Sequence, residues 1–363
     1  MSKLLFIRYR KSDKILEGGE QCTWRNYNAL TQILGADSVT TFHVHEEIEK
    51  KSLSTIIKGG FHSIFNYYYG LSAKRVKKIV SMAMEYDYVF IDRSVFAIIA
   101  KALKNAGYKG RIITFFHNVE VPYFKSKLTR KGIARHFVLK CVDANDRYAC
   151  EFSDKIIVLN ERDRNEIRNR YGRTADVIIP IAMEDKYQRE SYPSETTSEK
   201  PLCMFLGSYF PPNNEGIIWF VKNVLPHVNI EMEIVGKRMA KLKTDYPELL
   251  KDIKIVSDAP DLLPYFEKAD IMVLPIFTGS GMKVKTCESL MYGKNIIGTG
   301  EAFEGYDVDY DKVGGKCNTA EEFISKLNDF ASSPRSRFNG YSRKMYIDKY
   351  SQSAIIEKFK EAL

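Results

Sequence analysis

The segment Leu274–Gly298, LPIFTGSGMKVKTCESLMYGKNIIG, decides the fold class expected for this chain. The apolar run that ends at Leu274 is typical of a buried parallel strand, and Pro275 ends its hydrogen bonding. A glycine loop follows, then a helical pattern from about Met282, a turn and a second apolar strand. This order of strand, loop, helix and strand predicts one unit of a parallel α/β sheet.

The loop of this segment also predicts an anion site. Gly279 and Gly281 allow backbone N–H groups to approach a ligand closely, and the helix that follows directs the positive end of its dipole to the same place. Lys283 and Lys285 lie in or next to the first turn, where the dipole disfavours cations. A bound anion would remove this conflict. Glu288 is close enough along the helix to accept hydrogen bonds from ribose hydroxyls.

These features indicate a site for a nucleoside diphosphate, with the phosphates on the loop and the lysines, and the ribose on Glu288. The predicted donor-binding residues of the segment are Gly279, Ser280, Gly281, Met282, Lys283, Lys285 and Glu288. The alternative is a plain strand-to-helix turn with solvated lysines, because glycine turns are common and motif matches carry false positives. The residues of the segment alone leave both interpretations open.

The segment resembles the donor-binding segment of nucleotide-sugar-dependent glycosyltransferases of the GT-B fold, specifically the retaining family 4 and its relatives. The shared pattern is GSGMK, a hydrophobic residue, and K-x-x-E. The resemblance implies that Glu288 binds the ribose. Many relatives carry an earlier glutamate near the donor sugar, separated from the second by seven residues, and Ser280 stands at that position here. This difference leaves the contact with the sugar undefined.

The resemblance implies an α/β fold of the GT-B type, with two Rossmann-like domains that face each other across a cleft holding the active site. It places an acceptor-side domain at residues 1–180, a linker at 181–200 and a donor domain at 201–344. A C-terminal helix at about 345–363 is expected to cross back to the first domain. Strands that alternate with helices along the chain independently predict parallel sheets.

His117 and Glu120 follow the predicted strand Arg111–Phe116 in the sequence His-Asn-Val-Glu. The carboxyl ends of parallel strands are where α/β sheets bind ligands. In the relatives, a His-Asn-x-Glu segment lies over the donor sugar, so the resemblance implies that His117 hydrogen-bonds sugar hydroxyls and that Glu120 assists. The alternative for His117 is a capping or core histidine. The predicted catalytic residues are His117, Glu120 and Lys283.

Further candidates follow other predicted strands. Gly18 and Gly19 form a predicted loop before a helix at 23–34, and the resemblance places this loop on the acceptor side, near the donor phosphates. A flexible loop without function is the alternative. The predicted strand Leu202–Leu206 runs into a glycine and an Asn-capped helix at 215–224. The additional donor-binding candidates here are Gly207, Asn213, Lys237 and Arg238.

Length and composition fit an ordinary globular protein of two domains. The chain has 363 residues, of which 44% are hydrophobic and 28% charged, unlike a disordered chain. Its first apolar run is too short for a signal peptide, and no run reaches the ~18 residues of a membrane-spanning helix. We therefore expect a cytoplasmic protein. Scattered cysteines and histidines without ligand spacing predict reduced thiols, no metal site and no cofactor.

Positive charge is concentrated in the first half of the chain. Residues 1–180 carry 31 basic and 19 acidic side chains, a net of +12, whereas residues 181–363 carry 24 and 27, a net of −3. Basic clusters at 74–78 and 125–140 accompany the aromatic run 61–69. Cations beside interfacial aromatics favour contact with an anionic membrane surface. Solvated helix faces are the alternative, and no nucleic-acid-binding motif is present.

The predicted function is transfer of a sugar from a nucleotide diphosphate donor to an acceptor hydroxyl. The acceptor is expected to be a glycan or lipid-linked molecule of surface polysaccharide or glycolipid assembly. The lysines, the loop amides and the helix dipole would stabilise the leaving phosphate without a metal, and the resemblance implies retention of configuration. Two alternatives stay open, a nucleotide-sugar epimerase of the same architecture and a non-catalytic glycosyltransferase-like subunit.

Overall fold

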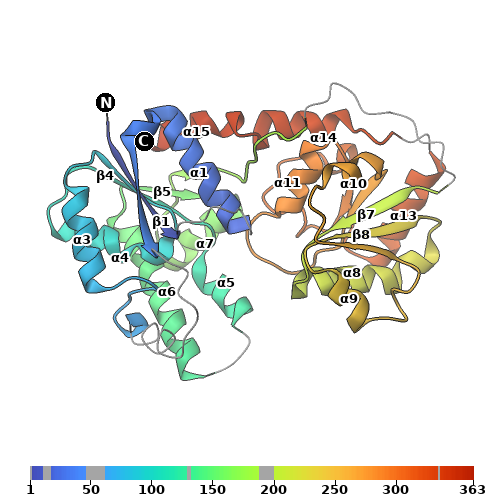
Figure 1. Cartoon of the computed structure of the whole chain (residues 1–363), viewed down its shortest axis with the longest axis horizontal. Coiled ribbons are helices and arrows are strands. Elements are labelled where there is room, and N and C mark those ends of the chain that lie inside the picture. Colours follow the sequence, from blue (N-terminus) through green and yellow to red (C-terminus); the bar gives the residue numbers. More distant parts are fainter. Residues whose placement is uncertain (1, 11–17, 46–61, 129–131, 188–199, 334–335) are drawn as a thin grey trace. The chain divides into compact units, whose positions relative to one another are not determined.

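The computed structural model describes residues 2–10, 18–45, 62–128, 132–187, 200–333 and 336–363. The chain divides into two compact units (Figure 1). Unit 1 comprises Met1–Ile181 together with Ile355–Leu363, and unit 2 comprises Ala182–Ala354. The C-terminal segment therefore belongs to the same compact unit as the N-terminus.

Unit 1 is built on a parallel sheet of six strands in the order β2-β1-β3-β4-β5-β6. Its strands are β1 (Leu4–Arg10), β2 (Val39–His45), β3 (Tyr88–Ile91), β4 (Arg111–Phe115), β5 (Lys155–Val158) and β6 (Val177–Ile178). Its helices are α1 (Gly18–Leu34), α3 (Ala73–Ala83), α4 (Ile98–Asn105), α5 (Glu120–Lys127), α6 (Ile133–Phe152), α7 (Glu161–Tyr171) and α15 (Ile356–Ala362). The central strands are short apolar runs because helices cover the sheet and both faces are buried.

Unit 2 contains a second parallel sheet of six strands, in the order β12-β11-β10-β7-β8-β9. These strands are β7 (Leu202–Leu206), β8 (Glu231–Gly236), β9 (Lys254–Ser257), β10 (Ile271–Leu274), β11 (Asn295–Gly298) and β12 (Gly314–Lys316). The helices are α8 (Pro211–Asn223), α9 (Ala240–Asp245), α10 (Leu263–Lys268), α11 (Val284–Met291), α12 (Tyr310–Val313), α13 (Ala320–Ser332) and α14 (Gly340–Met345). Two parallel sheets with helices confirm the predicted α/β fold class.

Three predicted details of the loops are wrong. Gly18 and Gly19 are not a loop, because α1 begins at Gly18. The helix after β7 begins at Pro211, since proline suits the first turn of a helix. Asn213 therefore lies inside that turn and does not precede it. The helix of the decisive segment begins at Val284, one residue after Lys283, whose backbone is extended.

Side-chain caps stabilise the starts of α7 and α13. The side chain of Asn160 accepts a hydrogen bond from the amide of Asp163 at the start of α7. Thr319 and Glu322 form a capping box, in which each side chain accepts from the other residue's backbone at the start of α13. Both caps satisfy amides that a helix leaves without an internal partner.

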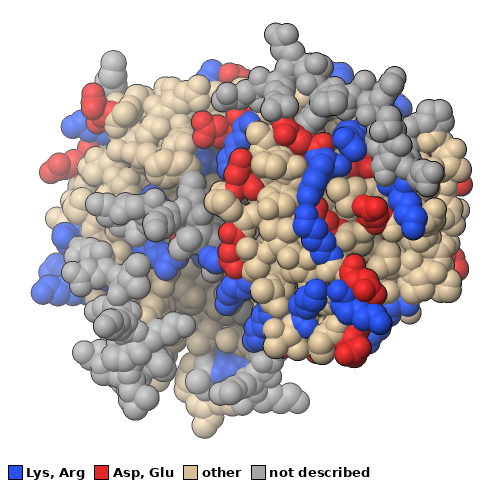
Figure 2. All heavy atoms as spheres, turned by 45° about the vertical axis from the view of Figure 1, so that its right-hand side comes forward, with Lys and Arg blue, Asp and Glu red and all other residues tan. Residues whose placement is uncertain are grey.

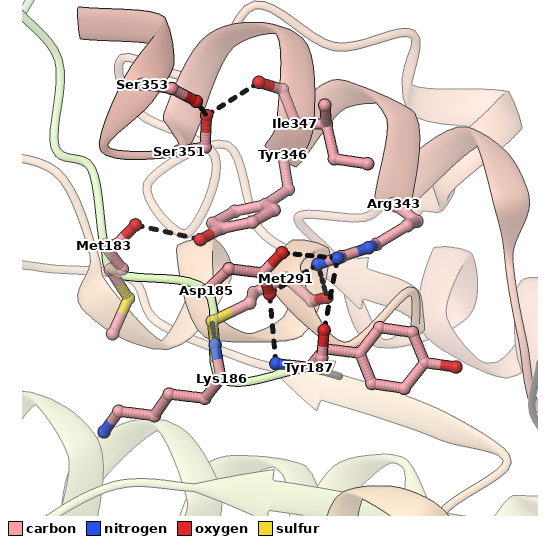
Figure 3. Close-up of polar contacts among 10 residues, drawn as sticks. All are labelled: Met183, Asp185, Lys186, Tyr187, Met291, Arg343, Tyr346, Ile347, Ser351 and Ser353. Carbon is pink, nitrogen blue, oxygen red and sulfur yellow. Dashed lines mark hydrogen bonds and ion pairs between the residues drawn. The ribbon is translucent and has the colours of Figure 1, made fainter. Parts of the chain in front are cut away.

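The first residues of the predicted linker are packed against unit 2. Arg343 donates to both carboxylate oxygens of Asp185, at 2.9 and 2.5 Å, and to the carbonyl of Met291 at the end of α11, at 2.7 Å (Figure 3). The hydroxyl of Tyr346 donates to the carbonyl of Met183 at 2.8 Å. Residues 182–187 of the predicted linker therefore pack within unit 2, where an arginine far along the chain holds them. Residues 188–199 lie outside the described residues.

Candidate active site

Four loops of unit 2 meet at one edge of its sheet. Strands β11, β10, β7 and β8 are neighbours and parallel, so their carboxyl ends lie along the same edge. The residues that follow these strands include Glu301, Gly279, Gly207 and Lys237, respectively. This edge is where parallel α/β sheets bind ligands. Predicted donor-binding residues from distant parts of the sequence therefore share one edge.

Close backbone contacts along this edge require glycine at two positions. A Cβ atom on Gly236, where φ is +148°, would lie 1.8 Å from the carbonyl oxygen of Gly207. A Cβ atom on Gly216 would lie 1.8 Å from the carbonyl oxygen of Pro275, so α8 packs directly against the loop after β10. The two glycines hold the loops after β7, β8 and β10 close to one another.

Lys285 is the cation at the centre of this edge. Its Nζ atom donates to Oδ1 of Asn213 at 2.5 Å and lies 4.7 Å from the centre of the Phe205 ring. Asn213 in turn donates to the carbonyl of Ser208 at 2.8 Å. Burial lowers the pKa of Lys285 to about 7, although the charge of Glu288 opposes the shift. An ammonium group so poorly solvated would be stabilised by an anion.

Lys283 lies at the mouth of the same loop. Its Nζ atom donates to the carbonyl of Gly281 at 2.8 Å and pairs with Oε1 of Glu301 at 2.6 Å. The hydroxyl of Tyr306 donates to the carbonyl of Lys283 at 2.7 Å, which holds the start of α11. Of the two lysines of the predicted phosphate site, Lys283 therefore directly precedes this helix and Lys285 lies in its first turn.

Glu288 lies one turn further along α11. Burial raises the pKa of its carboxyl to about 7, while Lys186 and Lys285 act in the opposite direction. Lys186 comes from the packed segment 182–187, where its side chain is exposed and extends away from the Arg343 contacts (Figure 3). When Glu288 is ionised, its carboxylate can accept hydrogen bonds from hydroxyl groups. Burial removes part of its hydration, so such hydrogen bonds would replace lost contacts with water.

The remaining donor-binding candidates are exposed. Lys237 and Arg238 follow β8, and both side chains reach solvent. The amide of Arg238, a residue with φ of 58°, donates to the carboxylate of Asp258 at 3.1 Å. Basic and acidic side chains alternate over the face of unit 2 that comes forward in Figure 2. The described contacts of these two residues do not connect them with Lys283 or Lys285.

In unit 1, His117 is buried directly after β4. Its Nε2 atom lies 3.3 Å from Oδ1 of Asp92, which follows the neighbouring strand β3. Asn26 and Thr23, both on α1, donate to the two oxygens of Asp92 at 2.7 and 2.5 Å. His117 is 5% exposed and Asp92 1%. The ends of two adjacent strands and one helix therefore hold the imidazole in place.

The charges around His117 favour its protonated form. Burial lowers the pKa of His117, but Cys22 and Asp92 more than compensate and raise it to about 9. Burial also opposes ionisation of Cys22, yet Arg25 and His117 lower the pKa of its thiol. Arg25 donates to the sulfur at 3.3 Å. The raised pKa favours an imidazolium at neutral pH, and in that form both ring N–H groups are donors.

Glu120 and the predicted acceptor-side glycines lie near the same strand ends. Glu120 is 3% exposed, and its amide donates to Oδ2 of the buried Asp146 at 2.9 Å. Burial and the charge of Glu120 raise the pKa of Asp146 well above its usual range. A Cβ atom on Gly19 would lie 2.7 Å from Nη2 of Arg93, after β3. Gly18 and Gly19 therefore begin α1 beside the strand end that carries Asp92.

Comparison with known proteins bears first on unit 2. Residues 200–332 match a family model described as glycosyl transferases group 1. Comparison with curated protein sequences gives no match. Unit 2 is a glycosyltransferase domain.

Solved structures extend the likeness in fold to the whole chain. The Anabaena protein HepE in complex with UDP and glucose has a TM-score of 0.67 and 13% identity, with 99% of each chain covered. Sucrose-phosphate synthase from Thermosynechococcus elongatus has a TM-score of 0.70 and 13% identity, over 99% of this chain and 98% of that one. The lipopolysaccharide outer core galactosyltransferase WaaB has a TM-score of 0.64 and 14% identity, over 99% and 98%. The predicted GT-B fold is thereby confirmed.

Three residues of the glycosyltransferase enter these clusters without having been predicted. Glu301 reaches Lys283 from the turn after β11, Lys186 acts on Glu288 from the packed segment, and Asp92 holds His117. Asp92 carried a usable signal, since it directly follows a predicted strand. Glu301 and Lys186 carried none, because neither lies in a recognisable motif and both are brought in by tertiary contacts.

Two further findings concern the described part of the glycosyltransferase alone. No three His, Cys, Asp or Glu side chains gather there closely enough to hold a metal ion. None of its helices has both the length and the apolar character needed to span a bilayer.

Proposed function

We propose that this glycosyltransferase moves a sugar from a nucleoside diphosphate donor to an acceptor hydroxyl, with the donor diphosphate on residues 279–283 and Lys285. One observation carries the proposal. Lys285 is an incompletely solvated cation at the carboxyl edge of the sheet, next to a loop of glycine amides and to Lys283. The two lysines and the glycine amides can all act on the oxygens of a diphosphate bound there.

The ribose of the donor is assigned to Glu288. Its carboxylate lies about one helical turn from Lys285 on α11. If Lys285 binds the diphosphate, this spacing would place Glu288 next to the ribose that the diphosphate is attached to. HepE, one of the structures with the same fold, is described in complexes with UDP and with UDP-glucose. We therefore propose uridine diphosphate sugars as the first donors to test.

Charge stabilisation in the transfer step would come from the protein. The bond between the sugar and the leaving phosphate breaks as the acceptor oxygen attacks, and negative charge grows on the diphosphate. Lys283, Lys285 and the amides at the start of α11 would stabilise this charge without a divalent cation. The pattern GSGMKVKTCE supports retention of configuration, with the leaving phosphate assisting deprotonation of the acceptor.

His117 is assigned to hydroxyl groups of the transferred sugar, with Glu120 beside it. As a buried imidazolium held by Asp92, it offers N–H donors in a defined orientation. A glycan or lipid-linked acceptor, as in surface polysaccharide or glycolipid assembly, is proposed to bind on the unit 1 side, near Gly18 and Gly19.

Association with an anionic membrane surface is a second part of the proposal. Ile133 at the start of α6 is 78% exposed, and Phe65 and Ile64 are 56% and 47% exposed. Lys125 and Lys140 are exposed on the same unit. Apolar side chains among cations favour an anionic interface. Vesicle flotation should show binding to anionic vesicles and not to neutral ones; equal binding to both, or to neither, would refute it.

The experiment that tests the proposed function is thermal unfolding with UDP, GDP, ADP and TDP sugars. A ligand at about 100 times its Kd adds about 2.7 kcal/mol of stability, which gives a measurable shift. We expect one nucleotide class to stabilise the wild type and the shift to disappear in Glu288→Ala. Asp311→Ala, which removes an exposed carboxylate of the same unit, is the matched control and should keep the shift.

The outcomes separate the alternatives. A shift followed by sugar transfer to an added acceptor supports the proposal. Conversion of the donor sugar without an acceptor would indicate an epimerase, and binding without any turnover would indicate a non-catalytic subunit. No shift with any donor would mean that the loop after β10 is only a strand-to-helix turn.

A further inference from the structure

The loop assigned to the diphosphate already contains an anion of the protein. Oε1 of Glu301 lies 2.6 Å from Nζ of Lys283, and the two side chains are only 18% and 11% exposed. A Cβ atom added to Gly279 would lie 3.4 Å from Nζ and 3.5 Å from Oε1. The carboxylate is therefore beside the same backbone that the proposed function assigns to the donor phosphates.

The turn after β11 holds Glu301 at this place. The amide of Thr299 donates to the carbonyl of Leu274 at 3.2 Å, and the amide of Gly300 donates to Oδ1 of Asn318 at 2.9 Å. On the other side of Glu301, the carbonyl of Ala302 accepts from Thr286 of α11 at 2.6 Å. Glu301 is thus positioned by backbone contacts on both sides, independently of its pair with Lys283.

We propose that Glu301 is a built-in counter-ion that competes with the donor diphosphate for Lys283 and so weakens the hold on the nucleoside diphosphate product. The inference rests on the proposed function, since it assumes that the diphosphate binds at Lys283. Carboxylate and phosphate oxygens are both acceptors for an ammonium group, and Lys283 already gives one N–H to Gly281. When phosphate takes the N–H now given to Glu301, two anions face each other across the loop and repel.

A counter-ion of this kind would matter most after transfer. The product nucleoside diphosphate carries one more negative charge than the sugar-bound diphosphate, so repulsion by Glu301 acts more strongly on product than on donor. When Lys285 is protonated, it attracts the donor and the product alike. Glu301 would accordingly favour release of the product and protect Lys283 from other anions in the empty site.

The test is isothermal titration calorimetry of the full chain with UDP, UDP-glucose and inorganic pyrophosphate. Glu301→Gln keeps the size of the side chain and removes its charge. We expect it to tighten UDP binding by roughly five- to tenfold, with a smaller gain for UDP-glucose. In a Lys283→Met background the same substitution should give a clearly smaller gain, since the contested ammonium is gone. Asp311→Asn is the matched control and should leave each Kd unchanged.

Several results would overturn the inference. If the wild type binds UDP, unchanged or weaker UDP binding in Glu301→Gln, and in Glu301→Ala as a second variant, would do so. Weaker UDP-glucose binding with unchanged UDP binding would instead make Glu301 a contact of the sugar. If no nucleotide binds but pyrophosphate binding tightens in Glu301→Gln, the counter-ion role stands and the proposed function fails. If neither nucleotides nor pyrophosphate bind to the wild type or the variant, both the counter-ion inference and the proposed function are refuted.

Discussion

Lys285 should couple nucleotide binding to proton uptake. Its pKa in the free protein is about 7 because of burial, and a bound diphosphate would raise that pKa again. Binding above pH 7 therefore requires a proton, and affinity should fall from pH 7 to pH 9 by up to about tenfold per unit. Calorimetry in buffers of different ionisation enthalpy should detect the uptake. Lys285→Arg, which stays charged, should bind without it; equal uptake in this variant would contradict the assignment.

Lys294 predicts a different pH dependence, that of stability. It is fully buried, its ammonium donates to the carbonyl of Arg337 at 2.9 Å, and burial lowers its pKa to about 7 from an unfolded value near 10.4. Between these values the unfolded chain binds the extra proton, so stability rises with pH, by about 1.4 kcal/mol per unit from this group. Urea unfolding at pH 7, 8 and 9 should show a shallower rise in Lys294→Met. An identical slope would refute the prediction.

At the scale of elements, Arg343 of α14 joins the packed segment 182–187 to the end of α11. It forms a two-bonded pair with Asp185, and donates to the carbonyls of Met291 and Tyr187. Arg343→Met should lower the free energy of unfolding of unit 2 by about 1–2 kcal/mol, since two partly buried carbonyls and one exposed carboxylate lose a charged donor. Lys344→Met, at the residue next to Arg343, is the control. It removes only an exposed pair with Asp348 and should change the free energy of unfolding by less than about 0.5 kcal/mol.

The same substitution should loosen the nucleotide site, because α11 carries Lys285 and Glu288. Hydrogen exchange should become faster in the peptides that cover residues 182–187 and 284–292, and not in those of β7 or β8. Faster exchange across the whole of unit 2 would instead indicate general destabilisation and contradict a local role for Arg343.

At the scale of the whole molecule, the last residues of the chain stabilise the unit that contains the first. Phe359 of α15 is fully buried in unit 1, with its ring 6.3 Å from that of Phe90 on β3. Phe359→Ala should cost about 3–5 kcal/mol and speed hydrogen exchange in unit 1 peptides, leaving those of unit 2 unchanged. Lys360→Ala, at an exposed neighbour, is the control. Faster hydrogen exchange in unit 2 peptides alone would contradict the assignment of α15 to unit 1.

The α/β fold class and the local chemistry of the segment Leu274–Gly298 were predictable from the amino-acid sequence. Buried parallel strands are short apolar runs, and their alternation with helices is visible along the chain because each element buries its own residues. Capping at Asn160 and Thr319 was predictable for the same reason, since a cap acts within four residues. The glycines and lysines of the donor loop likewise lie within one turn of each other. Their role in donor binding stays a prediction.

The side chains that meet at the strand ends could not be predicted in this way, because tertiary contacts bring them together. Lys285 contacts Asn213 across 72 positions, and Lys283 meets Glu301 from beyond β11. Asp92 reaches His117 because β3 and β4 are neighbours. Gly18 and Gly19 were wrongly placed in a loop, because the packing of α1 against unit 1 outweighs the low helix propensity of glycine. Strand order sets these neighbours, and no local pattern of residues encodes the order in which parallel strands assemble.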